Sequence, residues 1–145
     1  IEVQLPFLQY LYGSDFRIVP ICMLFQDMST SREVGEAIAL AVRGSGRNTL
    51  LIASTDLTHY EPQQVAERKD RAIIEAVEAL DVGGLYRTVE ELPVSMCGYG
   101  PTAAVMVAAR ELGASRGELL KYATSGDITG DTLRVVGYAS IAITR

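Results

Sequence analysis

The sequence lacks the features that mark membrane, secreted and nucleic-acid-binding proteins. Its longest purely apolar runs, such as residues 50–53 and 103–109, are far shorter than the roughly 20 residues of a membrane-spanning helix. Thirteen lysines and arginines stand against eighteen aspartates and glutamates with no basic block, which argues against nucleic acid because such binding depends on clustered positive charge. The two cysteines, Cys22 and Cys97, lie far apart and do not resemble a secreted disulfide framework, so we expect a reducing, cytoplasmic setting.

Motifs of several enzyme classes are also absent. The chain has no G-x-S-x-G hydrolase elbow. Its glycines at Gly83 and Gly84 and in "SGDITGD" match neither a P-loop nor a dinucleotide fingerprint, and turns are the better interpretation. One histidine and two distant cysteines cannot close a structural zinc site without residues from elsewhere.

The composition is that of a compact folded protein. The chain has 145 residues, of which 48% are hydrophobic and 21% charged, so one domain can bury a core without disulfides. It opens at Ile1 with "IEVQLPFLQYL", a pattern typical of the middle of a folded element and unlike a signal peptide. We therefore expect a fragment whose missing amino-terminal half holds part of any site.

Alternating helical and strand patterns predict an α/β fold with a mixed β-sheet flanked by helices. The "STS" of residues 29–31 predicts a capped start for the second helix. Pro20 in the first strand suggests a sheet edge or a bulge, and the turn chemistry of "GDITGD" predicts that the last two strands pair like a hairpin. Helices are predicted at residues 1–12, 31–42, 62–80, 81–92 and 100–112, and strands at residues 16–25, 48–55, 118–125 and 133–144.

The stretch "STDLTHY", residues 54–60, carries the only histidine of the chain, His59, in a D-x-x-H arrangement with Asp56. It follows a predicted buried strand, and ligand-binding loops collect at the carboxyl ends of strands in open α/β sheets. A tight turn can bring the carboxylate to an imidazole nitrogen and fix the tautomer of the ring. The local sequence leaves a structural alternative open, in which Asp56 or Thr58 caps the next turn and His59 is a polar loop residue.

A second candidate site is "SMCGYGP", residues 95–101. Cys97 comes just before a predicted helix, where free backbone N–H groups and the helix dipole favour a nucleophile or a metal ligand, and the glycines allow a ligand to approach the backbone closely. In the alternative interpretation Cys97 is a small buried residue and "GYGP" only introduces the helix. Cys22 lies in a predicted apolar strand, so we expect it in the core.

Four separated motifs together resemble the Memo family, whose prokaryotic members are called AmmeMemoRadiSam system protein B. The motifs are "IEVQLPFLQ", "STDLTHY", "MCGYGPTAAVM" and the terminal "YATSGDITGD" with "VVGYASIAI", and they follow the family's order along nearly all of the chain. The glycine-rich "SGDITGD" and "VVGY" look more like the archaeal and bacterial branch than the animal one.

The resemblance implies an α/β fold similar to the class III extradiol dioxygenases, which are non-haem iron enzymes. Residues 1–145 would then be the carboxyl-terminal part of a single domain. The family's metal pocket combines two histidines of the amino-terminal half with the cysteine of a C-G motif, which maps onto Cys97. The family's D-x-x-H motif maps onto Asp56 and His59, which would line the same pocket as acid–base groups.

Two functions are consistent with these residues. The first is an iron- or copper-dependent redox or dioxygenase-like enzyme in which Cys97 is a metal ligand and His59, oriented by Asp56, moves protons. The family name also implies a radical-SAM protein as partner. The second is a non-catalytic module that keeps the fold and uses the pocket to hold a peptide or a small molecule. A third, purely structural domain would bind neither metal nor ligand there.

Overall fold

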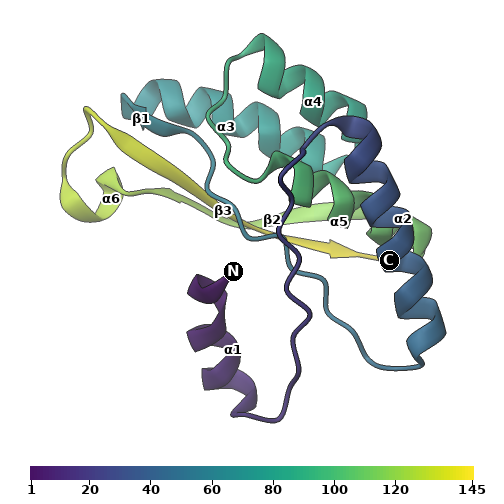
Figure 1. The fold of residues 1–145 in the computed structure, drawn as a ribbon. Coiled ribbons are helices and arrows are strands. Elements are labelled where there is room, and N and C mark those ends of the chain that lie inside the picture. The colour runs from purple at the N-terminus through teal and green to yellow at the C-terminus, as the bar shows by residue number, and fades with distance from the viewer.

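The computed structural model describes all of residues 1–145, in which most helices pack around a small sheet while the first helix lies apart from it (Figure 1). The elements in chain order are η1 (Glu2–Gln4), α1 (Leu5–Tyr12), α2 (Met28–Ser45), β1 (His59–Glu61), α3 (Gln63–Glu78), α4 (Val82–Glu91), α5 (Tyr99–Glu111), β2 (Arg116–Thr124), α6 (Gly126–Thr129) and β3 (Val135–Thr144). No helix combines the length and the apolar character needed to cross a membrane. The predicted α/β fold, with a sheet flanked by helices, is confirmed.

The sheet has three strands in the order β1-β3-β2, and both pairings are antiparallel. The long pairing of β2 with β3 runs from Arg116 opposite Thr144 to Thr124 opposite Gly137, which confirms the predicted antiparallel pair. The connection is the short helix α6, which ends at Gly130 with a left-handed φ of 77°. On the other side, β1 pairs with the beginning of β3 through His59 and Val136, so the sheet edge carries the histidine.

The core lies between the sheet and helices α3, α4 and α5. Its fully buried side chains come from all of these helices and from the strands, with Ile73, Leu85 and Met106 among the largest. Helix α2 packs on α5, where the missing side chain of Gly35 lets the helix lie against Ala104 and Val107 of α5. The close helix packing that the alanine-rich sequence of α5 predicts is therefore present, and a glycine of α2 contributes to it.

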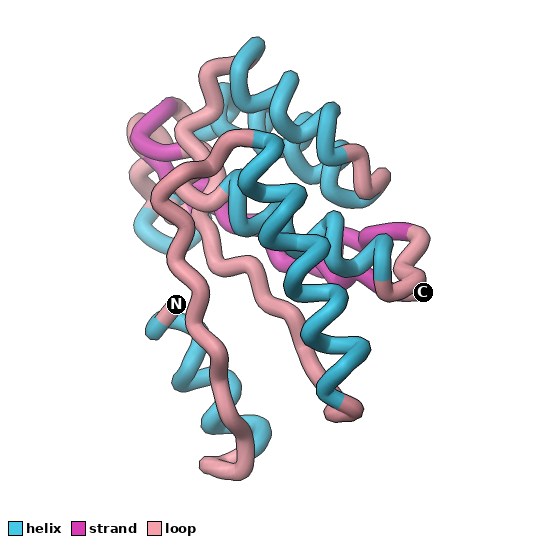
Figure 2. Tube along the Cα trace, turned by 45° about the vertical axis from the view of Figure 1, so that its right-hand side comes forward, coloured by secondary structure: helices cyan, strands magenta, loops and turns pink.

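Two predicted strands, at residues 16–25 and 48–55, are not formed, so these predictions are wrong. Both segments are drawn as loops (Figure 2) and neither pairs with another strand. Their apolar side chains are largely exposed, including Val19 at 86% and Leu50 at 69%. Cys22, which we expected in the core, is also exposed. The sequence has the β-branched, apolar pattern of a strand, but a strand also needs a hydrogen-bonding neighbour, and this chain supplies none.

The beginning of α2 differs from the prediction as well. The helix starts at Met28, and the residue that caps it is Asp27, whose carboxylate accepts the backbone N–H of Thr30 at 2.9 Å. The same carboxylate accepts the hydroxyl groups of Ser29 and Thr30. The hydrogen bonds from Ser29 and Thr30 hold the pKa of Asp27 well below its usual value. The "STS" stretch therefore supports the cap instead of forming it.

Candidate metal centre

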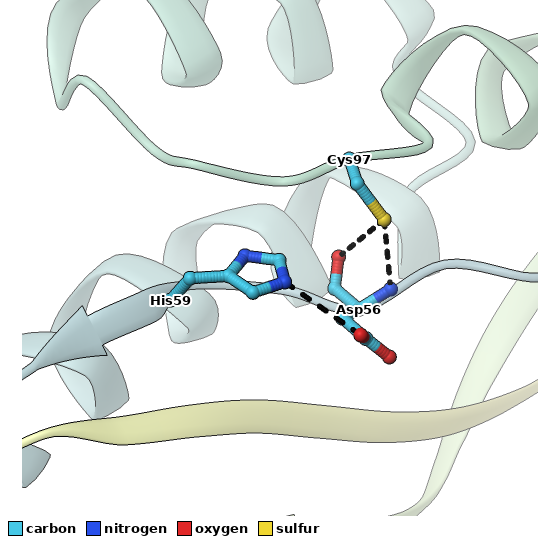
Figure 3. Close-up of side chains that lie close together, drawn as sticks. All are labelled: Asp56, His59 and Cys97. Atoms are coloured by element: carbon cyan, nitrogen blue, oxygen red, sulfur yellow. Dashed lines mark hydrogen bonds and ion pairs between the residues drawn. The ribbon is translucent and has the colours of Figure 1, made fainter.

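The structure brings Asp56, His59 and Cys97 together. One nitrogen, oxygen or sulfur atom of each residue lies within 4.8 Å of the others. The residues come from two separate parts of the fold, the segment that enters β1 and the turn before α5, and Figure 3 shows the thiol and the imidazole both directed at Asp56. Their predicted roles stay predictions, but their proximity gives a small site with three metal-ligating groups.

His59 is held by the turn that carries the cysteine. Its backbone N–H donates to the Ser95 hydroxyl oxygen at 2.7 Å, and its Nδ1 lies 2.8 Å from the Ser95 carbonyl oxygen. A carbonyl oxygen can only accept a hydrogen bond, so Nδ1 carries a proton and donates it. In the neutral ring Nε2 is then unprotonated, which leaves its lone pair free on the side that faces Asp56.

The carboxylate of Asp56 is a second hydrogen-bond acceptor beside Nε2 of His59. One of its carboxylate oxygens, Oδ2, lies 3.6 Å from Nε2 of His59. Neither Asp56 nor Thr58 makes a capping hydrogen bond to α3, whose N-cap residue is Pro62, and the roles of Asp56 and His59 stay predictions. A carboxylate oxygen and an imidazole lone pair that face each other repel unless a proton or a cation lies with them. The arrangement therefore accommodates either a metal ion or a proton shared by the two groups.

Cys97 adds sulfur to the set. Its Sγ accepts the backbone N–H of Asp56 at 3.4 Å and lies 3.5 Å from the hydroxyl oxygen of Thr55. The residue is exposed and is not in a disulfide, so the alternative of a buried structural cysteine is wrong. Thiolate and imidazole ligands suit iron, copper and zinc better than calcium or magnesium, which prefer oxygen.

A buried carboxylate fixes the segment just before His59. Asp70 of α3 is fully buried and accepts the backbone N–H of Thr58 at 2.9 Å and the hydroxyl of Tyr122 at 2.7 Å. Burial, and then the hydrogen bond to Asp70, raise the pKa of Tyr122 well above its usual value. A side chain at Gly137 of β3 would collide with the carboxylate of Asp70, so the glycine makes room for it. The Asp70 contact therefore ties α3 and the sheet to the start of β1.

Ser95 and Asp70 cannot be recognised from the sequence as groups that hold this site. Ser95 acts partly through its backbone carbonyl, which every residue has, so no side-chain pattern marks it. A signal for Asp70 exists, because this carboxylate lies on the same helical face as the buried Ala66, Ile73 and Val77. A charged residue in the apolar stripe of a helix is either paired or at a site.

A model of the family described as Memo-like protein matches residues 1–142. The chain belongs to the Memo family. The motifs that resembled this family in the sequence include both segments of the site, "STDLTHY" and "MCGYGP".

Several archaeal Memo relatives match all or nearly all of the chain. The MEMO1 family protein MK0963 of Methanopyrus kandleri is 60% identical over 145 residues, which are all of this chain and 51% of that protein. A MEMO1 family protein of Methanococcoides burtonii is 52% identical over 99% of this chain and 54% of its own length. The MEMO1 family protein MTH_45 of Methanothermobacter thermautotrophicus is 52% identical over 97% of this chain and 50% of its own length. The chain thus spans about half the length of the curated Memo relatives it matches.

Proposed function

We propose that this Memo-family chain supplies the cysteine-bearing side of a non-haem metal pocket, for iron or copper, with redox or dioxygenase-like chemistry on a substrate that is still to be found. The observation that carries the proposal is the convergence of Sγ of Cys97, a ring nitrogen of His59 and a carboxylate oxygen of Asp56 within 4.8 Å. These atoms come from two separate segments: the sulfur can bind a metal ion, and the imidazole–carboxylate pair beside it can take up a proton.

Each residue has a distinct part in this proposal. Cys97 holds the metal as a thiolate, and a bound iron or copper ion would supply one-electron chemistry. His59 accepts a proton at Nε2, because its Nδ1 proton is engaged by the Ser95 carbonyl oxygen. Asp56, 3.6 Å from that nitrogen, stabilises the imidazolium that results. A thiolate is a softer ligand than the carboxylate of the dioxygenases, which favours redox chemistry other than ring cleavage.

We also propose that an amino-terminal half completes the pocket with the two histidines that the family resemblance implies. Two findings support this: the chain spans about half of its relatives' length, and α1 and residues 16–25 expose large apolar side chains that a folded partner would cover. The extended segments 16–25 and 48–55 would then gain the strand neighbours that they lack in this chain.

The family resemblance supports two finer proposals, one about the location of the protein and one about its partner. The protein works in the cytoplasm of a prokaryote, consistent with its archaeal relatives. A radical-SAM protein is its partner, because the family's prokaryotic name includes one. Affinity capture of the tagged protein from its native host, followed by a search for a protein that carries an iron–sulfur cluster, tests that partnership.

The test of the metal proposal is elemental analysis of the full-length protein after anaerobic loading with iron(II) or copper(I). We expect about one metal ion per chain, retained in a Cys22→Ser variant and lost in Cys97→Ser. The Cys22 variant is the matched control, because both cysteines are exposed and free. Equal metal content in the Cys97→Ser variant would overturn the metal site. A loaded protein that binds a peptide but consumes no oxygen or reductant would favour the binding-module alternative.

A further inference from the structure

The turn that presents Cys97 is clamped by a glutamine from a distant segment. The side-chain amide nitrogen of Gln26 donates to the carbonyl oxygen of Cys97 at 3.1 Å. The amide oxygen of the same side chain accepts the backbone N–H of Gly100 at 2.9 Å. One planar group thus bonds the turn at both ends, which fixes the direction of the backbone on the carboxyl side of the cysteine.

A second contact holds the middle of the turn. The hydroxyl oxygen of Thr55, the residue next to Asp56, accepts the backbone N–H of Gly98 at 2.8 Å. It also lies 3.5 Å from the sulfur of Cys97. The cysteine is therefore located relative to the D-x-x-H segment by Thr55 and relative to the start of α2 by Gln26.

The two glycines of the turn make room for these clamps. A Cβ atom on Gly98 would lie 2.7 Å from Cβ of Thr55, and one on Gly100 would lie 2.8 Å from Cβ of Gln26. Neither glycine has a positive φ, so the backbone conformation does not require glycine. The two glycines of "CGYG" are explained by close packing, because Thr55 lies against Gly98 and Gln26 lies against Gly100.

The backbone at Gln26 is itself held in place by hydrogen bonds. The backbone carbonyl of Gln26 lies 2.7 Å from the hydroxyl of Tyr86, a buried residue of α4, and the next residue, Asp27, caps α2. Burial raises the pKa of Tyr86, so its hydroxyl keeps its proton as a donor. Gln26 is consequently fixed at its backbone and at its side chain.

We propose that Gln26 is a positioning residue for Cys97, and that its amide sets the direction in which the thiol faces Asp56 and His59. The effect of Gln26 on metal binding rests on the proposed function. Its effect on the orientation of the Cys97 thiol does not. Residues that orient a metal ligand through hydrogen bonds typically change metal affinity or activity by 10- to 100-fold when they are replaced.

The test uses the full-length protein and the variants Gln26→Met, which removes both hydrogen bonds, and Gln26→Glu, which keeps only an acceptor for Gly100. Gln64→Met, at an exposed position of α3, is the matched control. The first readout, without metal, is the alkylation rate of Cys97 from pH 6 to 10 measured on its own peptide by mass spectrometry, a range chosen as roughly two units around an ordinary thiol. Alkylation of the exposed Cys22 in the same sample reports general loosening.

The second readout is the titration of cobalt(II), followed by its sulfur-to-metal charge-transfer band. We expect a changed Cys97 alkylation profile in Gln26→Met with Cys22 unchanged, and a loss of cobalt affinity of about 10- to 100-fold. If Gln26→Met does not fold, the Cys97 alkylation profile of Gln26→Glu tests the role of Gln26 in its place. A Cys97 profile equal to that of the parent in the folded variants would overturn the proposal. If instead cobalt binding does not depend on Cys97, the metal proposal fails, while the alkylation profile still decides the role of Gln26.

Discussion

The imidazole Nδ1 of His59 lies 2.8 Å from the main-chain carbonyl oxygen of Ser95. Ser95 lies two residues before Cys97, so one short segment both fixes the ring and presents the thiol. This arrangement leaves Nε2 to face Asp56 and couples the position of the imidazole to that of the sulfur. A change in the turn should therefore affect both residues together.

The first prediction concerns the tautomer of His59. At a pH where the ring is neutral, the proton should reside on Nδ1, because the Ser95 carbonyl oxygen accepts it. Long-range proton–nitrogen NMR spectra of nitrogen-15-labelled protein distinguish the two ring nitrogens. A protonated Nε2 and a bare Nδ1 would contradict the hydrogen bond and the role assigned to Nε2.

The second prediction concerns Tyr122 and alkaline pH. Its pKa is raised above the ordinary value of 10.0, so the folded state retains the phenol proton where the unfolded state loses it. The contribution to stability is present below pH 10 and is lost as the pH rises further. The difference in unfolding free energy between the parent and Tyr122→Phe should shrink above pH 10, as measured by urea unfolding. Tyr10→Phe, at an exposed tyrosine, is the control, and an equal pH dependence in both variants would contradict the argument.

The third prediction concerns the space that Gly137 leaves for Asp70. Gly137→Ala should destabilise the protein by about 1–3 kcal/mol, the usual cost of an overpacked core. The cost should be smaller in an Asp70→Ser background, because the shorter side chain withdraws from the new methyl group. A double-mutant cycle by urea unfolding measures this coupling. Additive effects would show that the two residues do not compete for the same space.

The fourth prediction concerns the cap of α2. Because the pKa of Asp27 is held below its ordinary value of 3.8, its contribution to stability is present above that pH and falls away as the pH drops through the lower, folded-state value. Asp27→Asn should therefore unfold at a lower urea concentration than the parent at neutral pH, and the gap should narrow in acid. The control variant is Asp15→Asn, at an exposed position. At neutral pH its unfolding urea concentration should differ from that of the parent by less than that of Asp27→Asn does.

Helices could be predicted well from the sequence because their evidence is local. The apolar stripe of α3 and the glycines before α5 mark their elements within a residue or two. The pairing of β2 with β3 was also accessible, since a short turn-forming stretch joins two apolar runs. Residues 16–25 and 48–55 have the composition of strands, yet pairing depends on a neighbour that no local pattern specifies.

The site could be predicted only in part, for the same reason. His59 and Cys97 are visible as rare, reactive residue types beside glycines and at the end of an apolar run. Their convergence could be expected from the family resemblance and not from spacing along the chain. The groups that hold them, such as the Ser95 carbonyl and the Gln26 amide, are common polar groups whose importance depends on long-range geometry.

The most direct test of the metal site is X-ray absorption spectroscopy of the full-length protein loaded with one equivalent of zinc, compared with its Cys97→Ser variant. We expect one sulfur neighbour at about 2.3 Å from the metal in the parent and in the Cys22→Ser control, and its loss in Cys97→Ser. A metal shell of only nitrogen and oxygen in the parent, or an unchanged sulfur signal in Cys97→Ser, would show that Cys97 is not a metal ligand.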